Sequence, residues 1–171
     1  MKAFMDKDFM LQSATAQHLY HDYAAGMPIC DYHCHIPPRE IYENRRFDNI
    51  AQVWLGGRNP DGSYFGDHYK WRVMRSNGVP EEYITGDKPD RERFQKFAEA
   101  LPMAIGNPMY HWTNLELHTF FGYDGVLNGD TAEEVWNLCN DKLQHDPKLT
   151  VRASSSRATC LHRPPPMTPI D

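Results

Sequence analysis

The chain has 171 residues, of which 40% are hydrophobic and 24% are charged, and its formal net charge is -5. This composition is typical of a folded protein with one hydrophobic core rather than of a disordered chain. The negative net charge argues against nucleic acid and against an anionic membrane surface as partners. The sequence contains no run that approaches the roughly 18 apolar residues of a membrane-spanning helix. The N-terminal residues lack the apolar run of a secretory signal, so we expect a cytoplasmic protein.

The first part of the chain predicts a helix followed by a strand. Apolar residues recur at helical spacing over 14–25, and Ser13 is suited to cap the start of that helix. A strand is expected at about 29–35, where the sequence is rich in apolar and aromatic residues. Pro37 and Pro38 end it, because proline has no backbone N–H to donate to a sheet.

After the strand, the sequence predicts mostly helices. Asp48 is expected to cap a short helix, and residues 56–66 have the composition of a loop. Four longer helices follow. The first is expected to be capped by Asp67 and to end at Asn77 and Gly78, and the second spans 90–104. The third begins at Pro108, and the fourth spans 132–144 with Thr131 and Glu134 as a capping box. A second short strand is expected at 149–152 or 168–171. Residues 153–171 show neither the helical nor the strand spacing of apolar residues, and they contain three consecutive prolines. We therefore expect a disordered tail.

The strand at 29–35 carries the pattern His33-Cys34-His35. Side chains alternate between the two faces of a strand, so His33 and His35 share one face while Cys34 points to the other. Two imidazoles on one face can converge on a single divalent metal ion such as Zn²⁺. The alternative is that they are two surface histidines without a ligand, which is common for so short a pattern.

A second group of polar residues spans the junction between loop and helix at 66–75. A histidine such as His68 can move protons near neutral pH, and Tyr69 is a phenol beside it. Arg72 or Arg75 could hold a carboxylate through paired hydrogen bonds. The alternative is a capped surface helix whose apolar side chains face the core and whose cations are all solvated.

Taken together, these segments resemble uronate (glucuronate) isomerase. The resemblance rests on five ordered segments over about residues 1–152: 9–11 (FML), 19–24 (LYHDYA), 31–38 (DYHCHIPP), 67–79 (DHYKWRVMRSNGV) and 105–117 (IGNPMYHWTNLEL). The family interconverts D-glucuronate with D-fructuronate, and D-galacturonate with D-tagaturonate. On this resemblance His33 and His35 are metal ligands, usually for Zn²⁺, and His68 and Tyr69 are the catalytic pair acting on a small-molecule uronate.

The resemblance also implies the fold class. The expected class is α/β: the N-terminal portion of a metal-dependent (β/α)8 barrel of the amidohydrolase superfamily, with a helical insertion at about 39–145 after the first strand. A complete barrel needs about 250 residues, so the chain is expected to be mostly helical and inactive alone. Unpaired strand edges and apolar patches are then expected to favour a homo-oligomer. Two alternatives remain: a metal-dependent hydrolase of the same superfamily, and a helical interaction module whose histidines are structural.

Overall fold

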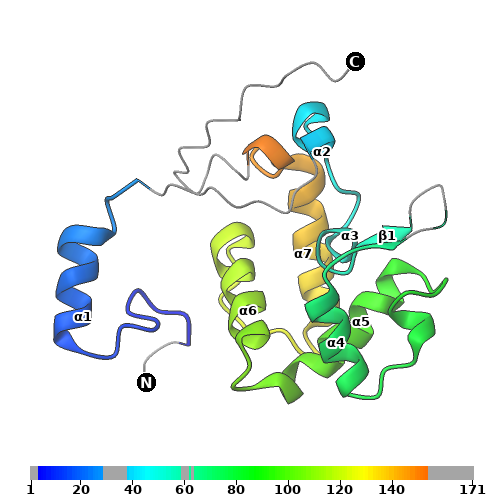
Figure 1. Ribbon diagram of the computed structural model, residues 1–171, viewed down its shortest axis with the longest axis horizontal. Coiled ribbons are helices and arrows are strands. Elements are labelled where there is room, and N and C mark those ends of the chain that lie inside the picture. Colours follow the sequence, from blue (N-terminus) through cyan, green and yellow to red (C-terminus); the bar gives the residue numbers. More distant parts are fainter. Residues whose placement is uncertain (1–3, 29–37, 59–61, 63, 154–171) are drawn as a thin grey trace. The chain divides into compact units, whose positions relative to one another are not determined.

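The computed structural model describes residues 4–28, 38–58, 62 and 64–153 (Figure 1). The chain divides into two units, one made of Met1–Arg46 with Pro147–Asp171 and the other of Phe47–Asp146. The described residues are mostly helical, as predicted. None of their helices is long and apolar enough to cross a membrane. The predicted strand at 29–35 lies outside the described residues and stays a prediction. Of the predicted tail at 153–171 only Ala153 is described, and it is helical rather than disordered.

The first unit begins with the helix that the sequence predicts. Helix α1 spans Ala14–Leu19 and continues as a π-helix over Tyr20–Ala24. The Ser13 hydroxyl accepts a hydrogen bond from the Ala16 N–H at 3.1 Å, which confirms Ser13 as the N-cap. None of the residues of this helix is buried within the described structure. The helical period was therefore sufficient to predict the helix but not the surface against which its apolar side would pack.

The same unit contains α2, Pro38–Glu43, and a short helical segment at 151–153. The Arg152 Nε donates to the Ile41 carbonyl at 2.8 Å, and its backbone N–H donates to the Asn44 side chain at 3.1 Å. The Val151 N–H donates to the Arg45 carbonyl at 3.1 Å. A strand at 149–152 was therefore a wrong prediction, because these polar groups are satisfied by the end of α2 and the residues after it. The other expected position, 168–171, lies outside the described residues.

The second unit is a helical cluster with one short hairpin (Figure 1). Its α-helices are α3 Ile50–Trp54, α4 His68–Ser76, α5 Asp90–Ala100, α6 Pro108–Phe121 and α7 Ala132–His145. Two 3-10 turns follow Pro80 and Ala100, at Glu81–Tyr83 and Leu101–Ala104. Strands β1, Gly57–Arg58, and β2, Tyr64–Phe65, pair antiparallel with Gly57 opposite Phe65. The segment predicted as a loop at 56–66 is therefore a hairpin.

Helix α5 lies at the centre of this unit and packs against α3, α4 and α7. Phe94 and Phe97, three residues apart on α5, are fully buried as their spacing predicts. The Trp54 indole stacks on Phe94 at 6.1 Å between ring centres and meets Phe97 edge-on at 5.9 Å. The other fully buried large apolar side chains are those of Ile50, Leu55, Met74, Ile84, Leu101, Leu117, Leu127 and Val135.

The helix caps show where local signals were sufficient. Asn107 caps α6 with Pro108 in its first turn, and the Gly122 at its end is left-handed. Two caps differ from prediction. Asn49, rather than Asp48, caps α3 by accepting from the Gln52 N–H at 3.0 Å. Thr131 does not cap α7, because its hydroxyl donates to the Val126 carbonyl at 2.9 Å in the preceding turn.

Candidate functional site

The predicted site residues fall into two groups. His33 and His35 lie within 29–37, outside the described residues, so their role as metal ligands stays a prediction. His68 and Tyr69 are described and open helix α4. In the part of the chain that the structure describes, no three His, Cys, Asp or Glu side chains come together as a metal site.

The turn before α4 places His68 and Tyr69. Asp67 has the extended backbone of an N-cap, and its Oδ1 accepts a hydrogen bond from the Tyr69 N–H at 2.8 Å. Gly66 lies against the preceding segment so closely that an added Cβ would be 2.4 Å from the Leu55 carbonyl oxygen. The first turn of α4 is thus fixed by its cap and by close packing of the backbone behind it.

The structure brings the side chains of His68 and Tyr69 together. Their ring centres are 4.3 Å apart, with an angle of 33° between the ring planes. Both side chains are exposed, and Tyr69 retains 55% of its accessible surface. An imidazole and a phenol held side by side in water-accessible positions are able to accept and donate protons to a bound molecule. The two rings are thus neighbours at the start of α4, and their catalytic role stays a prediction.

Lys70, the next residue, does not behave as the sequence suggested. The alternative interpretation of this segment, a surface helix, predicted that all its cations are in contact with water. Lys70 is instead only 5% exposed. Its Nζ donates to the Asp67 Oδ2 at 3.0 Å and lies 5.8 Å from the centre of the Trp54 ring. Burial raises the pKa of the Asp67 carboxyl, but the Lys70 ammonium and the N–H groups of the helix start outweigh it, so the pKa is lowered overall.

Glu116 of α6 completes this buried cluster. Burial raises the pKa of the Glu116 carboxyl, while the Lys70 ammonium and a hydrogen bond from the Trp54 side chain oppose that increase. Sequence analysis missed both Lys70 and Glu116. The spacing of three between Asp67 and Lys70 was a usable signal for an ion pair on a helix. Nothing local pointed to Glu116, which comes from a different helix.

The two candidate arginines for a substrate carboxylate are in different situations. Arg75 already forms a paired interaction with Glu81, with its Nε 2.8 Å from Oε2 and a terminal nitrogen bonded to Oε1. Arg72 lies one turn from Tyr69, with its guanidinium carbon 5.9 Å from the centre of the phenol ring. Arg72 and Tyr69 line the same open cavity of about 330 Å³, which Arg75 does not line. Of the two arginines, Arg72 is therefore the better placed to bind a carboxylate in that cavity.

The ion pair of Glu81 gives a pH-dependent contribution to stability. Hydrogen bonds from Arg75, and next from Thr85, lower the pKa of Glu81 from 4.5 to about 2. A carboxyl whose pKa is lowered by folding stabilises the fold above its unfolded pKa and loses that contribution as the pH falls through the folded value. Because the side chains of Arg75 and Glu81 are both about half exposed, we expect their ion pair to contribute at most about 1 kcal/mol to the free energy of unfolding. Glu81→Gln should therefore reduce stability at pH 7, and the difference should shrink between pH 5 and pH 2.

Urea unfolding of the 171-residue chain across that pH range measures this difference. Glu82→Gln is a matched control, because Glu82 is adjacent and its nearest cation, Lys88, is 3.8 Å away. We expect a smaller effect of the Glu82 change at pH 7. A difference between wild type and Glu81→Gln that stayed constant from pH 7 to pH 2 would contradict the assignment to this ion pair.

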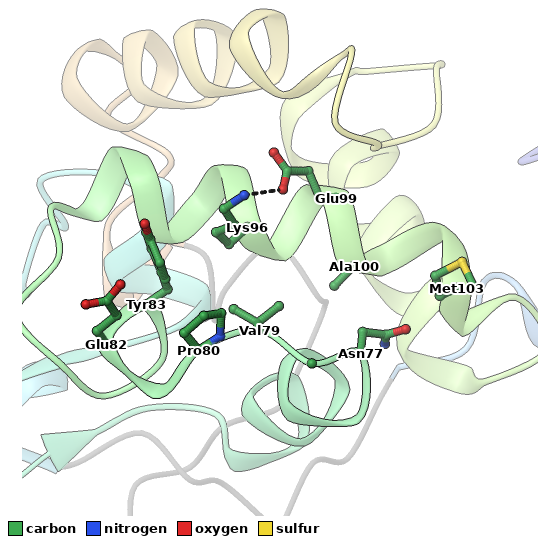
Figure 2. Close-up of a pocket in the computed structure, with 10 residues that line it drawn as sticks. Asn77, Val79, Pro80, Glu82, Tyr83, Lys96, Glu99, Ala100 and Met103 are labelled. Atoms are coloured by element: carbon green, nitrogen blue, oxygen red, sulfur yellow. Dashed lines mark hydrogen bonds and ion pairs between the residues drawn. The ribbon is translucent and has the colours of Figure 1, made fainter.

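A larger cavity, of about 600 Å³, lies on another part of the unit (Figure 2). It is lined by residues from the end of α4, the turn at Glu82 and Tyr83, and the side of α5 that carries Lys96 and Glu99. Figure 2 shows Lys96 and Glu99 paired with each other, at 2.7 Å, along one wall. Of the predicted site residues, the two that the structure describes, His68 and Tyr69, do not line this cavity. The smaller cavity of about 330 Å³ is the one lined by Tyr69 and Arg72.

Comparisons with known proteins agree over most of the chain. Residues 1–159 match the family described as glucuronate isomerase (UxaC). A uronate isomerase of Lachnospira eligens is 70% identical over 152 residues, which are 89% of this chain and 30% of that protein. A uronate isomerase of Lachnoclostridium phytofermentans is 59% identical over 152 residues, again 89% of this chain and 30% of that protein. The chain thus spans about 30% of the length of these curated relatives.

Two crystal structures resemble the chain as well. A uronate isomerase from Thermotoga maritima matches with a TM-score of 0.74 at 34% identity, over 87% of this chain and 30% of that one. A glucuronate isomerase from Caulobacter crescentus matches with a TM-score of 0.72 at 24% identity, over 87% of this chain and 31% of that one. The second likeness shows a shared fold only.

Proposed function

Because the chain belongs to the glucuronate isomerase family, we propose that the complete protein interconverts aldose and ketose forms of uronates. The proposed substrates are D-glucuronate with D-fructuronate, and D-galacturonate with D-tagaturonate. The family match over residues 1–159 is the observation that carries the proposal. The exposed His68 and Tyr69 pair beside Arg72 supports it, since it joins proton-transfer groups to a cation suited to a sugar acid.

The proposal includes the fold of the complete protein. We place the strand predicted at 29–35 at the start of a (β/α)8 barrel and the helices α2 to α7 in an insertion after it. The amidohydrolase superfamily has this architecture, and its active sites lie at the C-terminal ends of barrel strands. The mostly helical character of the described residues supports the insertion. The barrel itself would be completed by the part of the relatives that this chain does not cover.

The proposed chemistry divides between two sets of residues. His33 and His35 are the proposed metal ligands, and a divalent ion, with Zn²⁺ favoured, would supply Lewis acidity toward the substrate oxygens. Isomerisation moves a proton from C2 of the aldose to C1 and a second proton from the C2 hydroxyl to the C1 oxygen, so that the carbonyl passes from C1 to C2. His68 and Tyr69 are the groups we propose to hold and move protons, in this transfer or in ring opening. Arg72 is proposed to bind the substrate carboxylate, because the guanidinium of Arg75 is already paired with Glu81.

A chimaera tests the proposal directly. In it, the matched 152 residues of this chain replace their counterparts in the Lachnospira eligens uronate isomerase. We expect the chimaera to convert D-glucuronate to the ketose, measured by ketose formation. We expect a chelator to abolish the conversion, and the 171-residue chain alone to show none. An intact, folded chimaera that ignored all four uronates would contradict the proposal, and hydrolysis without isomerisation would favour the hydrolase alternative.

Histidine variants of the same chimaera test the metal assignment. His33→Ala with His35→Ala is expected to lower kcat by about 1,000-fold or more and to remove the bound metal, measured by elemental analysis. His145→Ala is the matched control, because among the described residues this exposed histidine of α7 bonds to Asp141 of its own helix. It is expected to retain both activity and metal. Full metal content in the double variant would contradict the assignment.

The remaining parts of the proposal concern location and assembly. We propose that the complete protein is cytoplasmic, as expected of a catabolic enzyme that acts on small sugar acids. Met103 and Ile105, on the surface of the second unit, are 76% and 72% exposed. Apolar side chains exposed to this extent favour burial against further polypeptide, either the rest of the protein or a second subunit.

A further inference from the structure

A group of charges around one buried lysine lies next to the candidate pair His68 and Tyr69, at the start of α4. We name it the Lys70 cluster, and it consists of Asp67, Lys70, Glu116 and Trp54. The ammonium of Lys70 is at its centre, bonded to Asp67 at 3.0 Å and facing the Trp54 ring at 5.8 Å. Glu116 interacts electrostatically with both Lys70 and Asp67. Asp67 is thus ion-paired with the buried Lys70, and Glu116 lies close enough to interact electrostatically with both.

Stability alone gives little reason for this arrangement. Removing an ammonium and a carboxylate from water costs several kcal/mol per ion, and their attraction often only repays that cost. Lys70 is on the first turn of α4, where its long side chain could readily extend into water, as exposed lysines do. Well-packed apolar residues at such positions are often equally stabilising or more so. The cluster therefore invites a functional explanation.

The geometry indicates what the cluster acts on. The two oxygens of Asp67 are used separately: Oδ1 accepts from the Tyr69 N–H at 2.8 Å, and Oδ2 accepts from Lys70 Nζ at 3.0 Å. Lys70 therefore holds the carboxylate in the one orientation in which it caps the helix. The first residues of that helix are His68 and Tyr69, whose rings lie 4.3 Å apart.

We infer that Lys70 is a positioning residue, which acts through Asp67 to fix the orientation of His68 and Tyr69 for proton transfer. The inference rests on the proposed isomerase function. Lys70 does not reach the substrate, since it is buried under the turn. Loss of its ammonium should misplace the pair, and a misplacement of about 1 Å can reduce turnover by about 100-fold.

The first test uses Lys70→Met in the chimaera described above. Methionine keeps an unbranched apolar stem of similar length and removes the ammonium. We expect kcat for D-glucuronate to fall by at least about tenfold while KM changes by less than about twofold, because the interaction matters in the transition state and not for substrate binding. Lys96→Met is the matched control: Lys96 is an exposed lysine paired with Glu99 at 2.7 Å, and kcat should not change.

The second test separates positioning from stability. Lys70→Met leaves the partly buried carboxyl groups of Asp67 and Glu116 without a neighbouring cation and is expected to lower the melting temperature. Adding Glu116→Gln removes one of these charges and should restore most of the melting temperature. If Lys70 is a positioning residue, kcat stays low in the double variant, because Asp67 still lacks its partner. Recovery of kcat together with the melting temperature would show a purely structural role and overturn the inference.

The third test does not depend on activity. Hydrogen exchange of the Tyr69 amide, measured by NMR on the 171-residue chain, reports the Asp67 cap itself. The double variant is expected to exchange this amide at least about tenfold faster than wild type. The Asn77 amide, which donates to the Val73 carbonyl at the other end of α4, should be unchanged. Unchanged exchange at Tyr69 would overturn the inference.

The experiments distinguish the two proposals. A wild-type chimaera without uronate isomerase activity contradicts the proposed function, and the exchange measurement then still decides whether Lys70 orders the turn. An active wild-type chimaera in which Lys70→Met retains full kcat contradicts the inference alone.

Discussion

Replacing Arg93 with methionine is expected to lower the free energy of unfolding of the Phe47–Asp146 unit by about 3–5 kcal/mol. Arg93 is only 5% exposed, yet it carries a full charge in the core. Its guanidinium donates to the carbonyl oxygens of Gly56 at 3.0 Å and Ile84 at 2.9 Å, and to the Asp90 carboxylate at 3.0 Å. Methionine would fill much of the volume but would leave these acceptors without a donor.

The measurement is urea unfolding followed by tryptophan fluorescence. All four tryptophans of the chain, Trp54, Trp71, Trp112 and Trp136, lie in this unit, so the signal reports it alone. Arg91→Met is the matched control, two residues away on the same helix. Arg91 pairs with Glu133, which is largely exposed, and an exposed pair is worth about 0–1 kcal/mol. Equal losses for the two variants would contradict the role assigned to Arg93.

Replacing Gly56 with alanine is expected to cost about 2–5 kcal/mol in the same measurement, as the sum of backbone strain and overpacking. Gly56 precedes β1 and has a φ of 69°, a left-handed conformation that strains any residue with a Cβ. An alanine Cβ would lie 1.8 Å from the Phe65 carbonyl oxygen, which belongs to the paired strand β2 and cannot move independently. The hairpin must open or shift to accommodate it.

Gly78→Ala separates the two costs. Gly78 has a φ of 73°, almost the same as Gly56, but an added Cβ there would meet no atom within 4 Å. This variant should therefore show only the backbone strain, about 1–2 kcal/mol. If both glycine variants lost the same stability, the close approach of Gly56 to β2 would not be a determinant of this fold.

The candidate site was only partly predictable from sequence. His68 and Tyr69 are neighbours in the chain and follow an Asp67 cap, so a local pattern was sufficient to place them at a helix start. The exclusion of Arg75 was not predictable, because its partner Glu81 comes from the next turn of chain after the helix. From the sequence, Arg72 and Arg75 are equivalent candidates to bind a substrate carboxylate. The fold distinguishes them, because Arg75 is already paired with the carboxylate of Glu81.

The sequence by itself determined the elements whose signals are local. The Asp67 cap, the proline start of α6 and the spacing of Phe94 and Phe97 all depend on residues within a turn or two of one another, and all were confirmed. The segments that resemble uronate isomerase were also readable in the chain alone. Short-range hydrogen bonds and helical periodicity need no knowledge of distant partners, which is why these predictions succeeded.

Only the tertiary structure decided which polar groups are buried and with whom. Lys70 and Arg93 look like solvated helix residues in the sequence, but the fold encloses both and supplies partners from other segments, Glu116 for one and Gly56 and Ile84 for the other. Thr131 likewise bonds to the preceding turn instead of capping α7. Burial of a charge is favourable only when several distant groups converge on it, and that convergence is a property of the folded chain rather than of any local pattern.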